Sequence, residues 1–159
     1  MPIQNPTSLP DWVPQEYMNP IMAAASQYQV DPLALAAIAK QESGFNPGAI
    51  GPTTKWGKAQ GMFQFLPSTA KSYGIDPLDP TQAANATAKM LAENLRKFGT
   101  LEQAIMAHHG GPNTKIWGPK TRAYGDSVMG IMGNNQSIAN PTQPDIDPAL
   151  LAILFEEML

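Results

Sequence analysis

Hydrophobic residues recur every three to four positions along most of this 159-residue chain, and such spacing is typical of amphipathic helices. It predicts helices over residues 20–29, 32–43, 67–73, 80–98, 100–109 and 120–129. A recurring dipeptide pairs an N-cap residue with proline at the first helical position; it occurs at Asn19-Pro20, Asp31-Pro32, Asp79-Pro80 and Asp147-Pro148. The pattern therefore predicts a mainly α fold.

The segments between these helices divide the chain into four parts. Residues 48–58 are rich in Gly, Pro and Thr without a helical period, and we expect a short β-hairpin there as a minor element. Residues 130–145 are rich in Gly, Asn, Gln, Ser and Pro, which is typical of a linker. We expect an N-terminal arm, a main domain, a linker and an apolar C-terminal helix, over residues 1–18, 19–130, 131–146 and 147–159.

The C-terminal helix expected over residues 148–159 is apolar over well more than half of its surface. Such a helix has to bury that surface. Packing on its own domain and docking on a partner protein both satisfy this requirement, and the pattern leaves the two alternatives open.

Composition excludes several classes of protein. The net charge is −3, the charged fraction is 14% and Lys and Arg do not cluster, so nothing favours nucleic-acid binding. The absence of cysteine excludes disulfides and thiolate metal sites. No apolar run is long enough to cross a membrane. The first residues lack the basic and apolar regions of a secretory signal peptide, so a substrate outside the cytoplasm would require another route of delivery.

Glu42 places a carboxylate on a helical face that is otherwise apolar. The spacing i, i+3, i+4 and i+7 defines this face, formed by Leu35, Ile38, Ala39 and Glu42. Burial and the negative end of a helix dipole both raise the pKa of a carboxyl group. Glu42 is therefore expected to keep its proton near neutral pH, as a general acid must. A solvated Glu in a last helical turn is the alternative that the pattern leaves open.

Four short sequence blocks contain or follow this residue in the chain. Residues 41–47 read QESGFNP, residues 61–70 read GMFQFLPSTA, residues 107–112 read AHHGGP, and residues 121–124 read TRAY. Over about residues 21–129 the chain resembles the soluble lytic transglycosylases of the goose-type-lysozyme-like superfamily. This resemblance implies a lysozyme-like multi-helix domain with an active-site cleft.

The resemblance also implies roles for individual residues. It makes Glu42 the catalytic acid and base. It assigns substrate contacts to Ser43, Gln64, His108, His109 and Tyr124. Four of these have a simpler alternative: Ser43 as a helix-end polar residue, Gln64 as an exposed loop amide, Tyr124 as a core residue and His109 as an exposed one. Trp56 and Trp117 stay unassigned, because tryptophan serves sugar clefts and cores alike.

His108 and His109 depart from the family pattern, which has Tyr and Asn at these positions. A cationic imidazole beside Glu42 would lower the pKa of its carboxyl group, whereas a neutral one would not. A metal site is not expected, because adjacent helical residues do not share a face and no HExxH pattern occurs.

The motif blocks supply only one acid, whereas most glycosidases use two. The resemblance implies a lytic transglycosylase without a cofactor. Such an enzyme cleaves the β-1,4 bond between N-acetylmuramic acid and N-acetylglucosamine in peptidoglycan and leaves a 1,6-anhydromuramic end. A hydrolytic muramidase of the same fold is one alternative. A virion structural or docking protein with a degenerate lysozyme-like domain is another.

The lack of a signal peptide bears on delivery. We expect a phage particle, or else a secretion machine, to bring the protein to the cell wall, where it would act in the periplasm. In that case the apolar C-terminal helix is the segment expected to dock on a virion or secretion-machine partner.

Overall fold

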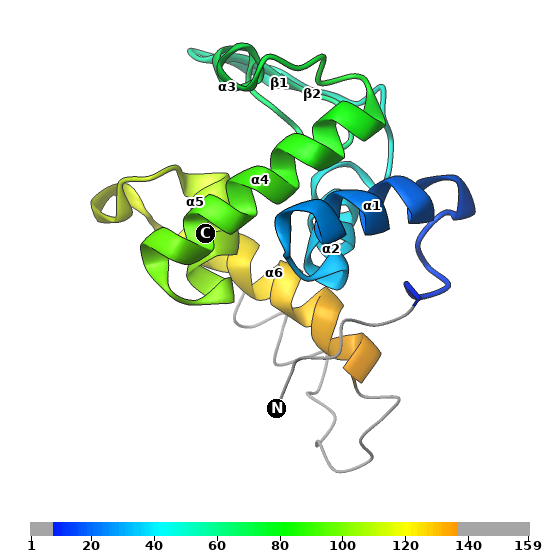
Figure 1. Ribbon diagram of the computed structural model, residues 1–159. Helices are drawn as coiled ribbons and strands as arrows, with labels where there is room; N and C mark the ends of the chain where they lie inside the picture. The colour runs from blue at the N-terminus through cyan, green and yellow to red at the C-terminus, as the bar shows by residue number, and fades with distance from the viewer. Residues whose placement is uncertain (1–7, 137–159) are drawn as a thin grey trace, which may run out of the picture.

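The computed structural model describes residues 8–136 and is mainly helical, with one small antiparallel sheet (Figure 1). In chain order the elements are α1 (Gln15–Tyr28), α2 (Pro32–Ser43), β1 (Ile50–Thr54), β2 (Gly57–Gln60), α3 (Pro67–Tyr73), α4 (Pro80–Phe98), α5 (Leu101–Gly110), the 3₁₀ turn η1 (Thr114–Ile116) and α6 (Pro119–Gln136). The predicted fold class and the minor hairpin are confirmed.

Helix α2 lies at the centre of the fold. Its N-cap Asp31 accepts a hydrogen bond from the Leu33 backbone at 2.8 Å, and Gly44 ends it in the left-handed conformation with φ of 61°. All residues from 32 to 39 are buried, and α2 contacts α1, α4 and α6. The predicted single apolar stripe was too narrow a description, because helices cover α2 on several sides.

Helix α4 is the longest helix within the described residues. Its two ends lie where the cap residues predicted them. Asp79 caps it by accepting a hydrogen bond from the Gln82 backbone at 3.0 Å, and Gly99 follows its last residue. The helix contacts α1 along one side and α5 along another. It also passes beneath α3 and the hairpin, which lie together at one end of the molecule (Figure 1). Helix α4 therefore joins the two halves of the fold.

The hairpin occupies the segment where it was expected. Strands β1 and β2 pair antiparallel, with an irregular register between Ile50 and Thr53. At its tip the Thr54 hydroxyl donates to the Gly57 carbonyl at 2.6 Å and accepts from the Trp56 backbone at 3.1 Å. Trp56 stands at this tip with 65% of its surface exposed.

The first helix begins earlier than predicted. Asn19-Pro20 does not start α1; the helix begins at Gln15, directly after Pro14, and Pro20 lies inside it. Proline in a helix removes one backbone hydrogen bond, but buried Val13 anchors the preceding turn on the core. Packing therefore outweighs the local proline signal.

The last described helix runs further than predicted. Helix α6 continues to Gln136, so the predicted linker does not begin at residue 130 or 131. Val128 and Met132, one helical turn apart, are both buried in the core and extend the helix through a stretch whose composition favours a loop. The predicted C-terminal helix and the rest of the predicted linker fall outside the described residues.

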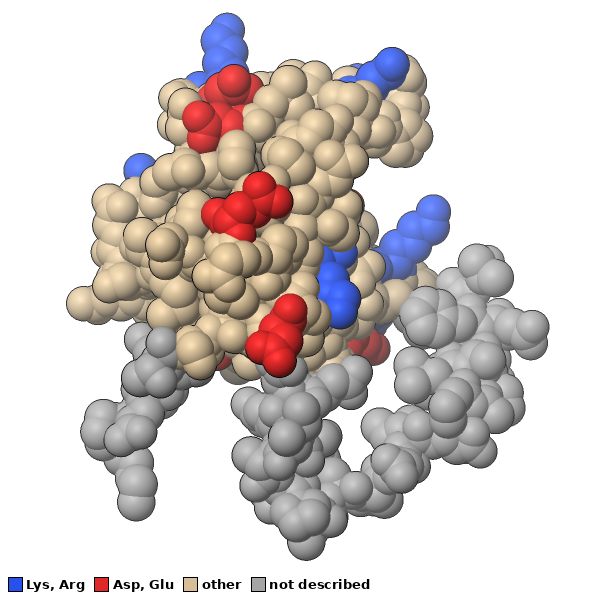
Figure 2. All heavy atoms as spheres, turned by 90° about the vertical axis from the view of Figure 1, so that its right-hand side faces the viewer, with Lys and Arg blue, Asp and Glu red and all other residues tan. Residues whose placement is uncertain are grey.

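No helix in the described part of the chain is both long and apolar enough to cross a bilayer. On the face shown in Figure 2, acidic and basic side chains are few and interspersed. That face therefore carries no basic patch of the kind that nucleic acids require.

Candidate active site

A pocket of about 250 Å³ opens at the C-terminal end of α2, and we call it the Glu42 pocket. Helix α2 contributes Glu42, and the segment from β2 to α3 contributes Gln64 and Phe65. Helix α4 contributes Met90, and α5 contributes His108 and His109. Four of the six residues predicted from the sequence thus line one cavity.

Glu42 projects from the last turn of α2 into this pocket, and only 16% of its side chain is exposed. Burial raises the pKa of its carboxyl group from 4.5 to about 7, and an interaction with the Tyr124 hydroxyl partly opposes this rise. The carboxyl group is therefore about half protonated at neutral pH, as predicted from its buried position.

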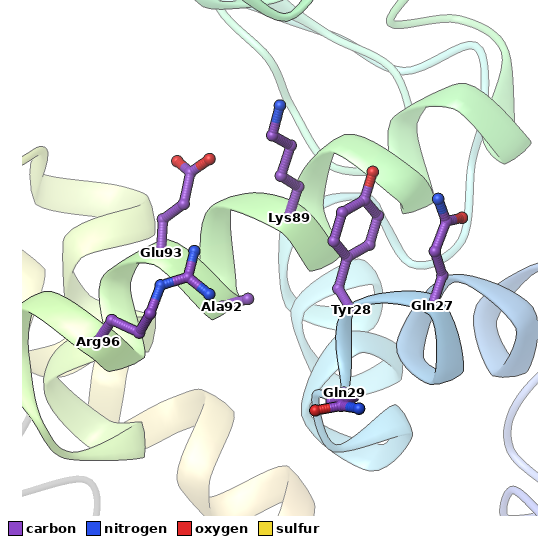
Figure 3. Close-up of a pocket in the computed structure, with 7 residues that line it drawn as sticks. All are labelled: Gln27, Tyr28, Gln29, Lys89, Ala92, Glu93 and Arg96. Atoms are coloured by element: carbon purple, nitrogen blue, oxygen red, sulfur yellow. The ribbon is translucent and has the colours of Figure 1, made fainter.

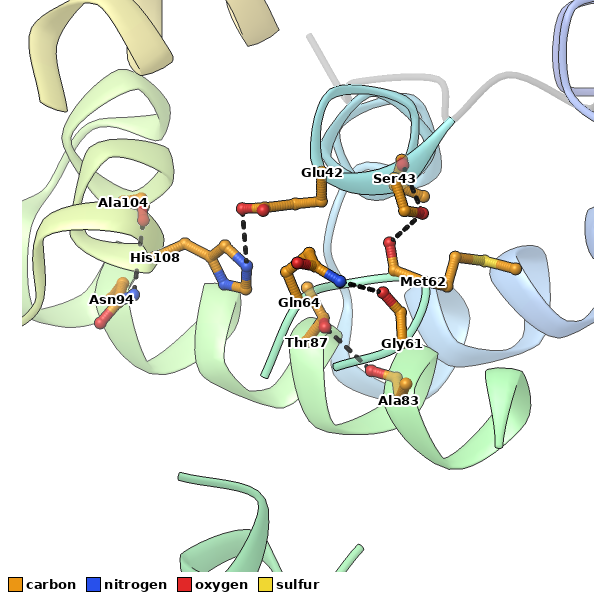
Figure 4. A network of polar contacts seen from close by, with 11 residues as sticks. Glu42, Ser43, Gly61, Met62, Gln64, Ala83, Thr87, Asn94, Ala104 and His108 are labelled. Carbon is orange, nitrogen blue, oxygen red and sulfur yellow. Dashed lines mark hydrogen bonds and ion pairs between the residues drawn. The ribbon is translucent and has the colours of Figure 1, made fainter. Parts of the chain in front are cut away.

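His108 faces Glu42 across the pocket, with 3.6 Å between its Nε2 and the Glu42 Oε1 (Figure 4). Burial lowers the pKa of the imidazole to about 4; a hydrogen bond to the Phe63 backbone raises it in part, and His109 lowers it further. The ring is thus neutral at pH 7, and its contact with Glu42 is not an ion pair. A neutral His108 leaves the pKa of Glu42 elevated, which answers the question that the sequence raised.

Tyr124 belongs to α6, lies close to the Glu42 carboxyl group and is 7% exposed. Its hydroxyl is buried and has no partner at ordinary hydrogen-bond geometry within the described residues. It nevertheless lies close enough to Glu42 to lower the pKa of that carboxyl group, and burial followed by the charge of Glu42 raises the pKa of Tyr124 itself. We interpret this as a long hydrogen bond, of the kind that tightens when substrate binds.

The aromatic rings of α5 and α6 pack together around Tyr124. His109 stacks on Tyr124 at 4.8 Å between ring centroids, and His108 stacks on it at 6.4 Å. His109 is exposed, but its Nδ1 lies 3.1 Å from the hydroxyl of buried Thr121. Although adjacent in a helix, the two histidines both reach the Glu42 pocket. No group of three potential metal ligands occurs within residues 8–136.

Gln64 holds the turn that precedes α3. Its Nε2 donates to the Gly61 carbonyl at 2.9 Å and to the Ala49 carbonyl at 3.2 Å (Figure 4). Its backbone has a positive φ of 52°, which is uncommon for a residue other than glycine. Both amide hydrogens are used by the backbone, so the amide oxygen is the atom left to accept a hydrogen bond from a ligand in the pocket.

Ser43 connects two of the motif blocks. Its hydroxyl donates to the Met62 carbonyl at 2.7 Å and accepts from the Asn46 backbone at 3.1 Å. The hydroxyl hydrogen is thus committed to a backbone carbonyl rather than to the Glu42 carboxylate. Ser43 fixes the end of α2 against the turn that carries Gln64, and its predicted substrate contact stays a prediction.

Sequence reasoning missed the contribution of α4. Met90 lines the Glu42 pocket, but its place in the chain looks like any half-buried helical position, and no motif marks it.

Trp117, in contrast, is a structural residue. Its indole nitrogen donates to the Gly111 carbonyl at 2.9 Å, and its ring packs on Phe98 at 5.5 Å.

Two phage proteins are similar in sequence to this chain. The transglycosylase of Enterobacteria phage PRD1 is 37% identical over 131 residues, which cover 79% of this chain and 48% of that protein. The peptidoglycan transglycosylase gp16 of Escherichia phage T7 is 34% identical over 121 residues, which cover 70% of this chain and 9% of that protein. The chain therefore spans about half of the first relative and a small part of the second.

Two solved structures share the fold. The 70 kDa soluble lytic transglycosylase of Escherichia coli aligns with a TM-score of 0.62 at 21% identity, over 80% of this chain and 25% of that one. An inactive mutant of the lytic transglycosylase Slt from Pseudomonas aeruginosa aligns with a TM-score of 0.62 at 20% identity, over 86% of this chain and 26% of that one. These likenesses confirm the predicted fold.

The family comparison covers most of the chain. Residues 19–130, which contain Glu42 and every residue of its pocket, match the model of the transglycosylase SLT domain. This match and the phage relatives agree with the motif blocks on which the resemblance was based. The chain belongs to the transglycosylase SLT domain family.

Proposed function

We propose that this protein is a peptidoglycan lytic transglycosylase in which Glu42 is the single catalytic acid and base. The observation that carries the proposal is the Glu42 pocket itself. Glu42 is the one acidic residue among those that line it, and burial raises the pKa of its carboxyl group to about 7. A group with this pKa exchanges a proton readily in either direction near neutral pH.

The reaction follows from this single carboxyl group. Protonated Glu42 donates its proton to the β-1,4 oxygen, and the bond from that oxygen to C1 of N-acetylmuramic acid breaks. The neighbouring N-acetyl group stabilises the cationic centre in place of an enzymic nucleophile. The Glu42 carboxylate then takes the proton of the C6 hydroxyl, whose oxygen bonds to C1. The product is a 1,6-anhydromuramic end, and no water is consumed.

Neutral His108 supports this cycle. A cationic imidazole at 3.6 Å would stabilise the Glu42 carboxylate and make its proton harder to transfer. The lowered pKa of His108 keeps that charge away above about pH 4. The Tyr124 hydroxyl lowers the pKa of Glu42, because it stabilises the carboxylate that forms after proton donation.

The mass of the released muropeptides tests this reaction. We expect each product to be lighter than its hydrolysed counterpart by one water, because the C6 hydroxyl replaces water at C1. Purified peptidoglycan digested with the protein and examined by mass spectrometry gives the answer directly. Products at the hydrolysed mass would instead assign a muramidase of the same fold. Intact peptidoglycan would favour a structural role with a degenerate domain.

We further propose that the protein acts on the cell wall as part of a phage particle. The names of the two phage relatives and their identities above 30% support this setting. The apolar segment 148–159 is the proposed contact with the particle.

Deletion of residues 148–159 is expected to lower incorporation into particles at least tenfold, because it removes the apolar contact surface. Wall-cutting activity in solution should be kept, since the Glu42 pocket lies within residues 42–109. Immunoblots of purified particles measure incorporation. Normal incorporation of the shortened chain would contradict the docking role.

A further inference from the structure

A second pocket, which we call the α1–α4 pocket, has a volume of about 290 Å³ (Figure 3). The end of α1 contributes Gln27, Tyr28 and Gln29, and α4 contributes Lys89, Glu93 and Arg96. The three α4 residues are spaced i, i+4 and i+7 and therefore form one stripe along the helix. None of these residues has a role in the site described above.

The two cations of this pocket can still bind an anionic ligand, although the Lys89 Nζ lies 5.9 Å from the centroid of the Tyr73 ring. Within residues 8–136, no carboxylate forms an ion pair with Lys89 or Arg96. Glu93 lies between them on the stripe, but its Oε2 accepts a hydrogen bond from the Tyr73 hydroxyl at 3.1 Å instead. Figure 3 shows Lys89 and Tyr28 extending to the same side, with the Arg96 side chain turned toward Ala92. The pocket thus has an excess of one positive charge.

The chemistry of the lining suits a carboxylate. A guanidinium offers a planar pair of N–H donors that match the two carboxylate oxygens, and an ammonium adds a second charge-assisted hydrogen bond. Gln27, Gln29 and Tyr28 also line the pocket, and their amide and hydroxyl groups are further potential donors. Among the residues that line this pocket, Ala92 is the one with a wholly apolar side chain.

The α1–α4 pocket and the Glu42 pocket lie on two sides of the same helix. Met90 lines the Glu42 pocket, and the preceding residue, Lys89, lines the other. Tyr73 links them, because its ring packs edge-on against Phe65 at 6.3 Å while its hydroxyl holds Glu93. A helix with its side chains is about 10–12 Å across, a distance that roughly three or four extended residues cover at about 3.3 Å each.

We propose that the α1–α4 pocket binds a carboxylate of the short acidic peptides that branch from the wall glycan, while the sugar chain occupies the Glu42 pocket. This inference rests on the proposed function, because that function supplies a glycan with peptide branches. It makes Lys89 and Arg96 determinants of substrate choice: the protein distinguishes glycan that carries its peptides from glycan without them.

The test reads the pocket without catalysis. Peptides released from purified wall by an amidase are titrated into the full chain, and binding is followed by calorimetry. We compare the wild type with the double variant Lys89→Gln, Arg96→Gln. Both residues are exposed, so the fold should be unaffected. A matched control, Lys71→Gln with Lys97→Gln, removes the same charge from exposed positions of α3 and α4 outside the pocket.

We expect the pocket variant to bind the peptides about tenfold more weakly, through the loss of two charge-assisted hydrogen bonds. The control should bind like the wild type, and peptides with amidated carboxyl groups should bind like the pocket variant. Equal binding by all three proteins, or undiminished binding of the amidated peptides, would overturn the inference. Because the titration involves no bond cleavage, its outcome is separate from that of the muropeptide mass measurement, which tests the proposed function alone.

Discussion

Replacement of Glu42 by Gln is expected to lower the rate of peptidoglycan cleavage by at least about 10³-fold. The loss of a positioned general acid or base typically costs about 10²–10⁴-fold, and in the proposed reaction one carboxyl group performs both proton transfers. Gln keeps the shape and the hydrogen-bonding oxygen of Glu but has no proton to give. Turbidity of a peptidoglycan suspension measures the rate, and the exposed Glu102→Gln variant on α5 is the matched control.

The same substitution is expected to make the protein more stable at alkaline pH. The pKa of Glu42 is about 7 in the folded state, above its value of 4.5 in the unfolded chain. Below about pH 4.5 the carboxyl is protonated in both states, and it does not change the free energy of unfolding. That free energy falls as the pH rises through 7, because the carboxyl ionises more readily in the unfolded chain than in the folded protein. Gln at this position has no charge to bury.

Thermal unfolding at two pH values measures this effect. The free energy of unfolding of Glu42→Gln should exceed that of the wild type by about 1–3 kcal/mol at pH 8, whereas the two proteins should be equal near pH 4.5. Retained cleavage by the variant, or equal stability of both proteins at pH 8, would argue against a buried catalytic carboxyl. An inactive but well-folded variant would separate the loss of chemistry from a loss of structure.

Replacement of Gly61 by Ala is expected to have the largest effect on stability, about 3–5 kcal/mol. Gly61 has a φ of 86°, and a Cβ atom there would lie 1.8 Å from the Pro77 carbonyl oxygen. A flexible side chain could move away, but this neighbour is backbone. The turn itself has little freedom, because the Gly61 backbone donates to the Ala49 carbonyl at 2.8 Å.

Gly74→Ala is the matched control for this substitution. Gly74 also has a positive φ, 66°, but nothing lies within 4 Å of the position that its Cβ would take. The Gly74→Ala variant should therefore be destabilised only by the cost of the left-handed conformation, about 1–2 kcal/mol. Chemical denaturation compares the two variants. Similar losses for both would show that conformation, rather than the contact with Pro77, requires glycine at position 61.

The effect of Gly61→Ala should extend to the active site. The Gly61 carbonyl accepts a hydrogen bond from Gln64, and the following residue, Met62, accepts one from Ser43 at the end of α2. A displaced turn would thus move both the Gln64 side chain and the helix end that carries Glu42. We expect cleavage activity to fall together with stability, even at temperatures where the variant stays folded.

Local signals in the sequence predicted most of the helices and the hairpin. Helix α2 begins after Asp31 and ends before Gly44 as expected, because cap residues act within one turn of the backbone. The prediction was wrong where packing overrides a local signal. Pro20 lies within α1 rather than at its start, and α6 runs through a Gly- and Asn-rich stretch to Gln136.

For the site, the motif blocks predicted a catalytic Glu42 and substrate contacts by Ser43, Gln64, His108, His109 and Tyr124. The structure brings four of these six residues to one cavity: Glu42, Gln64, His108 and His109. The motif blocks did not reveal that Met90 of α4 lines the Glu42 pocket, or that Ser43 bonds to the Met62 carbonyl. Both depend on which elements come together after folding. The α1–α4 pocket is a further case, since it combines residues from two helices more than fifty positions apart.

The sequence by itself predicted which residue would carry the proposed chemistry, and it determined where most of the helices begin and end. Motif spacing and cap residues are local properties, so they can be recognised in the sequence without knowledge of the fold. Only the tertiary structure decided the charge of His108. Burial lowers the pKa of His108 to about 4, so its ring is neutral at pH 7, and burial raises the pKa of Glu42 to about 7. Desolvation depends on every element packed around a group, and the chain order alone does not specify that environment.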